Sequence, residues 1–215
     1  MQKVSRLISA TVVALTCFGG TVAATVSTPR PAFAQEDRKY DPATTTVVVL
    51  PVVDATGEKV AERRKRQETV GYNNVKELFT KHGFQVVDEA KVTQALANSK
   101  VDLSDEENYR RETFYKVAKQ AGGDLVVFVL VTDTRTDKKT SLFKGDELQG
   151  RAKIKMWLLD AKNEQAILSA VTKEGKAGGA SKLFATNEGT DRRANAVGNA
   201  VKEQLEDFFK PYPMK

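Results

Sequence analysis

The sequence predicts an α/β domain built on a mixed β-sheet. Two β-branched runs, TTTVVVLPVVD at 44–54 and DLVVFVLVT at 124–132, are apolar almost throughout, which is typical of strands covered on both faces. The residues between these two runs have the apolar spacing of helices, and a helix between successive strands favours parallel pairing. Alternating residues in 148–175 predict an antiparallel hairpin. The expected order is β-α-β-α-α-β-β-β-α, in one domain at 44–210.

The first half of this domain alternates strands and helices. Pro51 lacks a backbone donor, so the end of the first strand is expected at an edge or a bulge. After a turn at 54–57, apolar residues recur at helical spacing in 58–82. A short strand at 84–88 and a helix at 89–98 follow, each with a single short apolar face.

The second half is predicted to begin with a helix at 102–121. Ser104 and Glu107 have the spacing of a capping box, and two glycines follow the helix as a stop signal. The remaining elements are a charged loop at 133–147, hairpin strands at 148–160 and 165–175, a Gly-rich loop at 176–191 and a helix at 192–209.

The leader at 1–34 has the layout of an export signal. Lys3 and Arg6 form a short positive region, the stretch 7–18 is apolar and uncharged, and Ala-Phe-Ala ending at Ala34 is a cleavage site. These features predict an exported protein, periplasmic or secreted, that begins at Gln35.

Other readings of the leader stay open. Cleavage could follow the Val-Ala-Ala at 22–24, and the uncharged stretch 7–26 is long enough to anchor the chain in a bilayer. Cys17 fits a bacterial lipobox poorly, because threonine precedes it. Beyond the leader, 35–43 is expected to be a flexible entry segment and 211–215 a tail.

Composition excludes several function classes. The 215 residues contain one Cys and one His, so the chain has neither a disulfide framework nor a Cys/His zinc cluster, and we expect no metal and no cofactor. The net charge is +6, but the leader holds three basic residues and no acidic one, so the exported chain carries about +3. That balance does not favour nucleic acid as a partner.

Four segments carry a resemblance to a family. They are VVVLPVVD at 47–54, GFQVVD at 83–88, AKQAGGDLVV at 118–127 and LLDAKNE at 158–164. The chain resembles, over 44–209, the superfamily of the TolB amino-terminal domain and the CsgG-like bacterial envelope proteins. Gly123 stands where that family usually has alanine, and Asn163-Glu164 where it often has Thr-Gly.

The resemblance implies an envelope protein that works by binding other proteins. Family members act in secretion pores, in activating cell-wall synthesis or as parts of envelope complexes. A pore needs long alternating membrane hairpins. The candidate insertions, 133–147 and 176–191, are too polar and charged to face lipid, so we expect no pore.

Three features are candidates for interaction. Asp54 follows the first strand, at the strand end where ligands of open α/β sheets bind. The run Arg63, Arg64, Lys65 and Arg66 is either a solvated first helical turn or a contact for an anionic membrane surface or an acidic partner. Trp157 either covers a helix layer or marks an exposed interface.

Other motifs favour structural roles. Asp124 begins its strand whereas Asp54 ends one, so the two carboxylates are not expected to meet. His82 lies near a helix C-terminus, where the helix dipole favours a cationic imidazole, and it has no second metal ligand. The Gly-rich stretch 175–182 lacks the spacing of a phosphate loop.

The function hypotheses follow from these features. The first is an exported, non-enzymatic envelope protein that binds or scaffolds other envelope or secretion components and self-assembles or captures a partner. The second is a binding module for a small anionic ligand or glycan at 54–66. An enzyme ranks last, because no nucleophile motif is present and His82 is the sole histidine base.

Overall fold

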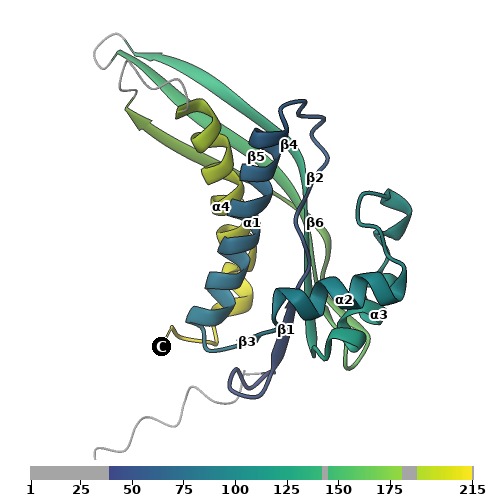
Figure 1. The fold of residues 1–215 in the computed structure, drawn as a ribbon. Helices are drawn as coiled ribbons and strands as arrows, with labels where there is room; N and C mark the ends of the chain where they lie inside the picture. The colour runs from purple at the N-terminus through teal and green to yellow at the C-terminus, as the bar shows by residue number, and fades with distance from the viewer. Residues whose placement is uncertain (1–38, 142–144, 181–187, 215) are drawn as a thin grey trace, which may run out of the picture. The chain divides into compact units, whose positions relative to one another are not determined.

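A computed structural model describes residues 39–141, 145–180 and 188–214, all within the unit Gln35–Lys215. The described residues form a single mixed α/β domain, as the sequence predicts (Figure 1). Its sheet has six strands rather than the five predicted, and four α-helices accompany it. The elements are β1 (Thr46–Val49), β2 (Val53–Asp54), α1 (Ala61–Lys81), β3 (Gln85–Val86), α2 (Glu89–Ser99), the short 3₁₀ helix η2 (Glu106–Asn108), α3 (Arg111–Ala121), β4 (Leu125–Ser141), β5 (Gly145–Asp160), β6 (Gln165–Ala180) and α4 (Glu188–Phe209).

The sheet combines a parallel and an antiparallel part. Its order is β3-β1-β4-β5-β6, and β2 pairs with β4 beyond the end of β1. The pairs that enclose helices, β1 with β3 and β1 with β4, are parallel, whereas β4, β5 and β6 form an antiparallel meander. The predicted pairing is therefore confirmed.

The first predicted strand is interrupted at Pro51. Val49 lies opposite Val127, but Val53 lies opposite Leu130, so this strand contains one more residue than β4 over the same interval. That extra residue is a bulge. Proline cannot donate to the ladder, which explains why the run 44–54 divides into β1 and β2 at this point.

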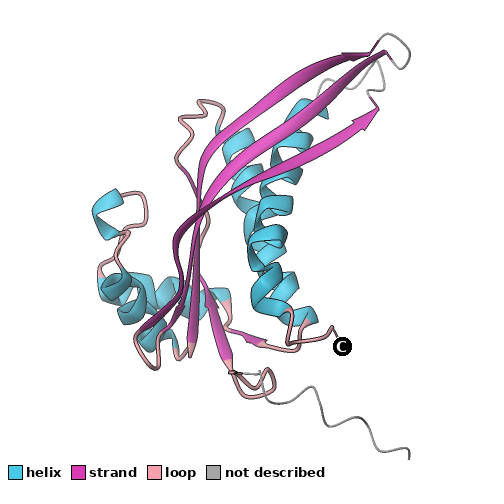
Figure 2. Cartoon of the chain, turned by 180° about the vertical axis from the view of Figure 1, so that it is seen from behind, coloured by secondary structure: helices cyan, strands magenta, loops and turns pink. Residues whose placement is uncertain are grey.

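Helices cover both faces of the sheet, which is why its central strands are apolar throughout (Figure 2). On one face Val127, Val129 and Val131 pack in the core that α1 and α4 cover. On the other face Phe128 and Leu130 pack in the core beneath α2 and α3. The two cores follow from the period-two alternation of side chains along β4.

Helix α4 lies unusually close to β5 and β6. A Cβ built on Gly150 would lie 2.3 Å from the Arg192 carbonyl oxygen, and one on Gly175 would lie 2.1 Å from the Ala196 carbonyl oxygen. Only a residue without a side chain fits at these two points. The glycines therefore let the helix backbone rest on the sheet.

Strands extend into two predicted loops. The segment 133–147 was expected to be a charged loop, but β4 extends to Ser141 and pairs antiparallel with β5 from Gly145, and β6 extends to Ala180. The expectation was wrong because charged residues there occupy an open sheet face. On such a face charged side chains form pairs across strands and are not buried in a core. The predicted loop at 176–191 also includes 181–187, outside the described residues.

The predicted helix at 102–121 is also divided. The helix α3 begins only at Arg111, and the Ser104–Glu107 capping box does not form. Instead Asp105 Oδ1 accepts a hydrogen bond from Glu107 N at 3.0 Å and caps the short helix η2. Aspartates at turn positions compete with helical hydrogen bonding in this way.

Both ends of the described chain pack onto the domain. Tyr212 is 3% exposed, and its hydroxyl accepts a hydrogen bond from Tyr40 N at 3.1 Å. Its carbonyl oxygen is in hydrogen-bond contact with His82 Nδ1, and the His82 ring stacks on Phe209 with centroids 4.1 Å apart. His82 is therefore part of the packed core, as its structural reading predicts.

A buried carboxylate fixes the turn between β5 and β6. Asp160 is 1% exposed and accepts hydrogen bonds from the Tyr40 hydroxyl and from the backbone and side chain of Asn163, each at 2.9 Å. Burial raises the pKa of the Asp160 carboxyl, but these hydrogen bonds and the Lys39 charge at 3.6 Å outweigh it and lower the pKa from its ordinary 3.8.

Replacing Asp160 with asparagine should therefore destabilise the domain in a pH-dependent way. A carboxyl with a lowered pKa stabilises the fold above its ordinary pKa and loses that effect as the pH falls through its folded value. We expect a loss of about 1–3 kcal/mol at neutral pH, from hydrogen bonds to a charged group. Urea unfolding should show that the free energies of unfolding of wild type and variant differ less at about pH 3 than at neutral pH. A difference of the same size at both pH values would contradict the role assigned to the Asp160 carboxylate.

Candidate functional site

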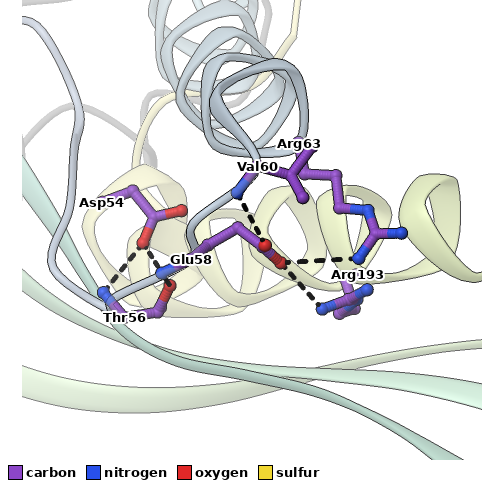
Figure 3. Close-up of polar contacts among 6 residues, drawn as sticks. All are labelled: Asp54, Thr56, Glu58, Val60, Arg63 and Arg193. Atoms are coloured by element: carbon purple, nitrogen blue, oxygen red, sulfur yellow. Dashed lines mark hydrogen bonds and ion pairs between the residues drawn. The ribbon is translucent and has the colours of Figure 1, made fainter.

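The segment that leaves β2 is an ordered loop. Asp54 Oδ1 accepts hydrogen bonds from Thr56 N at 2.8 Å and from the Thr56 hydroxyl at 2.6 Å, and Glu58 Oε1 accepts one from Val60 N at 3.1 Å (Figure 3). Glu58 Oε2 lies 3.3 Å from the Arg193 guanidinium of α4. These contacts tie the loop to the start of α1 and to α4.

The basic run does not form one patch. Arg63, Arg64, Lys65 and Arg66 are all exposed in the first turns of α1, where successive residues point in different directions. Arg63 lies 3.9 Å from Glu58 Oε2, whereas Arg64 lines a groove beside Asp54. The structure therefore brings Asp54 and Arg64 together and directs the rest of the run elsewhere.

A groove of about 900 Å³ opens at the carboxyl end of β2. Its charged lining consists of Asp54, Arg64, Glu68, Asp102 and Glu106, so carboxylates outnumber the single guanidinium. This is the end of a parallel sheet at which α/β proteins bind ligands. The groove is suited to a partner that carries positive charge.

Two carboxylates on the sheet side of the groove are close neighbours. Glu68 Oε1 accepts a hydrogen bond from Asp54 N at 3.3 Å, and Asp54 Oδ2 is buried without a hydrogen-bond partner. Burial raises the pKa of Glu68 and the Asp54 carboxylate adds to this effect, while the Asp54 N–H and Arg64 oppose it. A positively charged group bound here would stabilise the negative charge of both carboxylates.

The far wall of the groove is an acidic loop, which we define as Asp102–Glu107. It holds four exposed carboxylates in six residues: Asp102, Asp105, Glu106 and Glu107. Backbone contacts fix it, because Asp102 Oδ1 accepts from Ser104 N at 2.8 Å and the Tyr109 hydroxyl donates to the Leu103 carbonyl at 2.9 Å. Sequence reasoning missed this loop by treating it as a helix start.

Trp157 is a core residue. It is 7% exposed and packs among Phe128, Phe114 and Tyr109, with centroids 5.4, 5.9 and 6.4 Å away. The sequence left open whether it covers a helix layer or marks an exposed interface. Its burial against α3 agrees with the first alternative and not with an exposed interface.

A second cavity of about 360 Å³ lies against Trp157 and joins the groove. The two share Ala55, Glu106 and Tyr109, and the second is also lined by Lys155 of β5. Glu106 and Lys155 therefore line the same small cavity. The groove thus continues onto the sheet face above α2 and α3.

That part of the sheet face carries no helix in the described domain (Figure 2). Lys155 lies opposite Leu130, and directly opposite residues share a face, so Lys155, Lys153 and Lys176 point away from α4. All three lysines are exposed, and no carboxylate of the described chain lies within 4.0 Å of them. We call these three residues the lysine face.

The other charges described on this face are two arginines and three carboxylates, which pair with one another. Arg135 lies 3.8 Å from Asp133 and 3.6 Å from Asp137. Arg151 lies 2.7 Å from Asp137 and 3.6 Å from Glu174. The excess charge of the face therefore comes from its lysines.

Asp124 does not join Asp54. It directly precedes β4, where its Oδ2 accepts hydrogen bonds from Thr46 N and the Thr46 hydroxyl, each at 2.9 Å, whereas Asp54 pairs with Val131 further along that strand. This matches the expectation that the two aspartates do not meet. Within 39–141, 145–180 and 188–214, no three His, Cys, Asp or Glu residues are grouped as metal ligands, and no helix is long and apolar enough to cross a membrane.

Comparisons with known proteins give only distant matches. The sequence matches no protein-family model and no curated protein sequence. Similar solved structures include lipoprotein GNA1162 from Neisseria meningitidis (13% identity, TM-score 0.45, 76% of this chain and 99% of that one). Others are the hypothetical protein CT253 from Chlamydia trachomatis (13%, 0.44, 76% and 95%) and the LpoB C-terminal domain from Salmonella enterica (12%, 0.42, 66% and 87%).

These matches are with bacterial proteins, one of them a lipoprotein by name. They do not confirm the resemblance to TolB and CsgG proteins, which stays a prediction. At such identities and TM-scores they assign no function to this chain.

Proposed function

We propose that this chain is an exported, non-catalytic protein of the bacterial envelope that binds another protein. Its binding surface comprises the groove at Asp54 and Arg64, the acidic loop and the lysine face. Export is supported by the signal layout of the leader, with cleavage after Ala34. The envelope is supported by the resemblance to TolB and CsgG proteins.

One observation carries the binding role: opposite charges without partners lie side by side on this surface. Four carboxylates of the acidic loop and three lysines of the adjoining face have no ion pair in the described chain. Complementary charges at an interface guide partner encounter and set its orientation. The neighbouring cavity, where Ala55, Leu130 and Tyr109 lie beside Glu106 and Lys155, adds some apolar surface between the two charged patches.

The charge of the groove argues against the alternative, a small anionic ligand at 54–66. Asp54, Glu68, Asp102 and Glu106 face the groove together with Arg64 alone, and Arg63 lies near Glu58. An anion placed there would be repelled by most of the lining. A basic protein segment is the better fit.

Photocrosslinking in producing cells tests the role. A photoreactive residue at Ser104, or at Lys155, should give discrete protein adducts, whereas one at exposed Lys76 on α1 should not. The same cells should yield a mature chain whose mass begins at Gln35. The proposal fails if neither surface position forms an adduct above the Lys76 control, and its export component fails if the leader remains attached in the cytoplasm.

A further inference from the structure

We infer that the surface binds a second copy of this chain, in a two-fold dimer where each acidic loop contacts the other copy's lysine face. The inference rests on the proposed function and names the partner for the same surface. It treats the two charged patches as the two halves of one self-complementary interface.

The first argument is charge matching within one chain. The acidic loop contributes Asp102, Asp105, Glu106 and Glu107, and the lysine face contributes Lys153, Lys155 and Lys176. The acidic loop carries unpaired negative charge, and the lysine face carries unpaired positive charge. Their own chain does not join them, since no carboxylate of the described residues lies within 4.0 Å of those lysines.

The second argument is their placement. Glu106 and Lys155 line the same cavity, so the two patches adjoin on the side of the sheet that α2 and α3 occupy. Adjacent patches of opposite sign suit a two-fold axis between them, because each patch then faces its complement in the other copy. A head-to-tail ring instead needs its complementary patches on different sides.

The third argument concerns shape. Alternate residues on one strand face are about 6.6 Å apart, which sets the spacing of Lys153 and Lys155 along β5. The acidic loop is held by its own backbone contacts, so it presents its carboxylates with little ordering cost. Two such ordered surfaces can pair without refolding.

The exposed edge of β6 is a poorer route to self-association. Helix α4 lies on it, because Asn199 Nδ2 donates to the Lys176 carbonyl at 2.7 Å and Gly175 lies beneath Ala196 and Ala200. The Lys176 carbonyl is therefore already occupied by a hydrogen bond from α4.

The test uses light scattering on the chain purified from producing cells. The wild-type mass should rise towards twice the monomer with concentration and return to the monomer in about 1 M salt, which screens exposed charges. A loop variant, Glu106→Lys with Glu107→Lys, and a face variant, Lys153→Glu with Lys155→Glu, should each stay monomeric. All four positions are exposed, so folding should survive.

Mixing the two variants is the decisive step. In the mixed dimer one contact pairs an unchanged loop with an unchanged lysine face, and at the other the charges at the two substituted loop positions and the two substituted face positions are again opposite in sign, so an equimolar mixture should dimerise. A matched control, Lys91→Glu with Lys162→Glu, changes two exposed lysines elsewhere and should dimerise like the wild type.

A mixture that stays monomeric would overturn the inference, and so would a wild-type chain that is monomeric at every concentration. If such a chain still forms adducts with a different protein through Ser104 in cells, the proposed function holds and only the choice of partner is wrong. If Ser104 and Lys155 form no adduct at all, both fail.

Discussion

Replacing Gly175 with alanine should lower the free energy of unfolding by about 3 kcal/mol, the upper range for overpacking a core. The new Cβ would lie 2.1 Å from the Ala196 carbonyl oxygen and 2.4 Å from Ala200 N. Both are backbone atoms of α4, so no rotamer change relieves the clash. Urea unfolding followed by circular dichroism measures the loss.

Gly71→Ala is the matched control. Gly71 also lies at a packed interface, but its Cβ would meet only methyl groups of Val197 and Val52 at 3.2–3.4 Å. Alanine is a better helix former than glycine by about 1 kcal/mol, which offsets that contact. We expect a change within about 1 kcal/mol. Equal losses for the two variants would show that α4 does not rest on Gly175.

Replacing Trp157 with alanine should cost about 3–5 kcal/mol of stability, as for other buried tryptophans. The side chain is buried among Phe128, Phe114 and Tyr109, so its removal leaves a cavity between β5 and α3. Trp157→Phe keeps most of the apolar volume and should cost markedly less. Thermal unfolding of the two variants measures the difference.

An exposed interface residue would behave differently. Its alanine variant would retain stability and lose only binding, since surface substitutions usually change stability by less than about 0.5 kcal/mol. That result would restore the alternative in which Trp157 marks an interface.

The sequence was informative where burial sets the pattern. The apolar runs around Val48 and Val127 predict central strands, and their spacing with intervening helices predicts parallel pairing. The helical stripes of α1 and α4 include Gly71 and Gly198, and each of these glycines lies at the contact between the two helices. These features are local or periodic, so they can be recognised without knowing the tertiary structure.

The extended hairpin could not be recognised in the same way. Polar side chains of the hairpin such as Asp137 are stabilised by cross-strand partners, here Arg151, that are distant in sequence. A charged stretch with such partners has the composition of a loop. Charged strands are therefore underpredicted wherever one sheet face is open.

The candidate site was predicted only in part. Asp54 and Arg64 do meet at a groove, because the strand end and the first turn of α1 adjoin through a short loop. The acidic loop and the lysine face were missed. Their significance depends on which charges lack partners, and that is a property of the folded chain rather than of the sequence.

Amine labelling in intact cells tests the central claim most directly. Lys153, Lys155 and Lys176 would be modified by an amine-reactive reagent in producing cells and in dilute purified protein, with Lys91 and Lys162 as internal controls. Mass spectrometry should show the three face lysines protected several-fold in cells and the controls modified equally. Equal labelling of all five lysines in both states would contradict the claim that this face forms a protein interface.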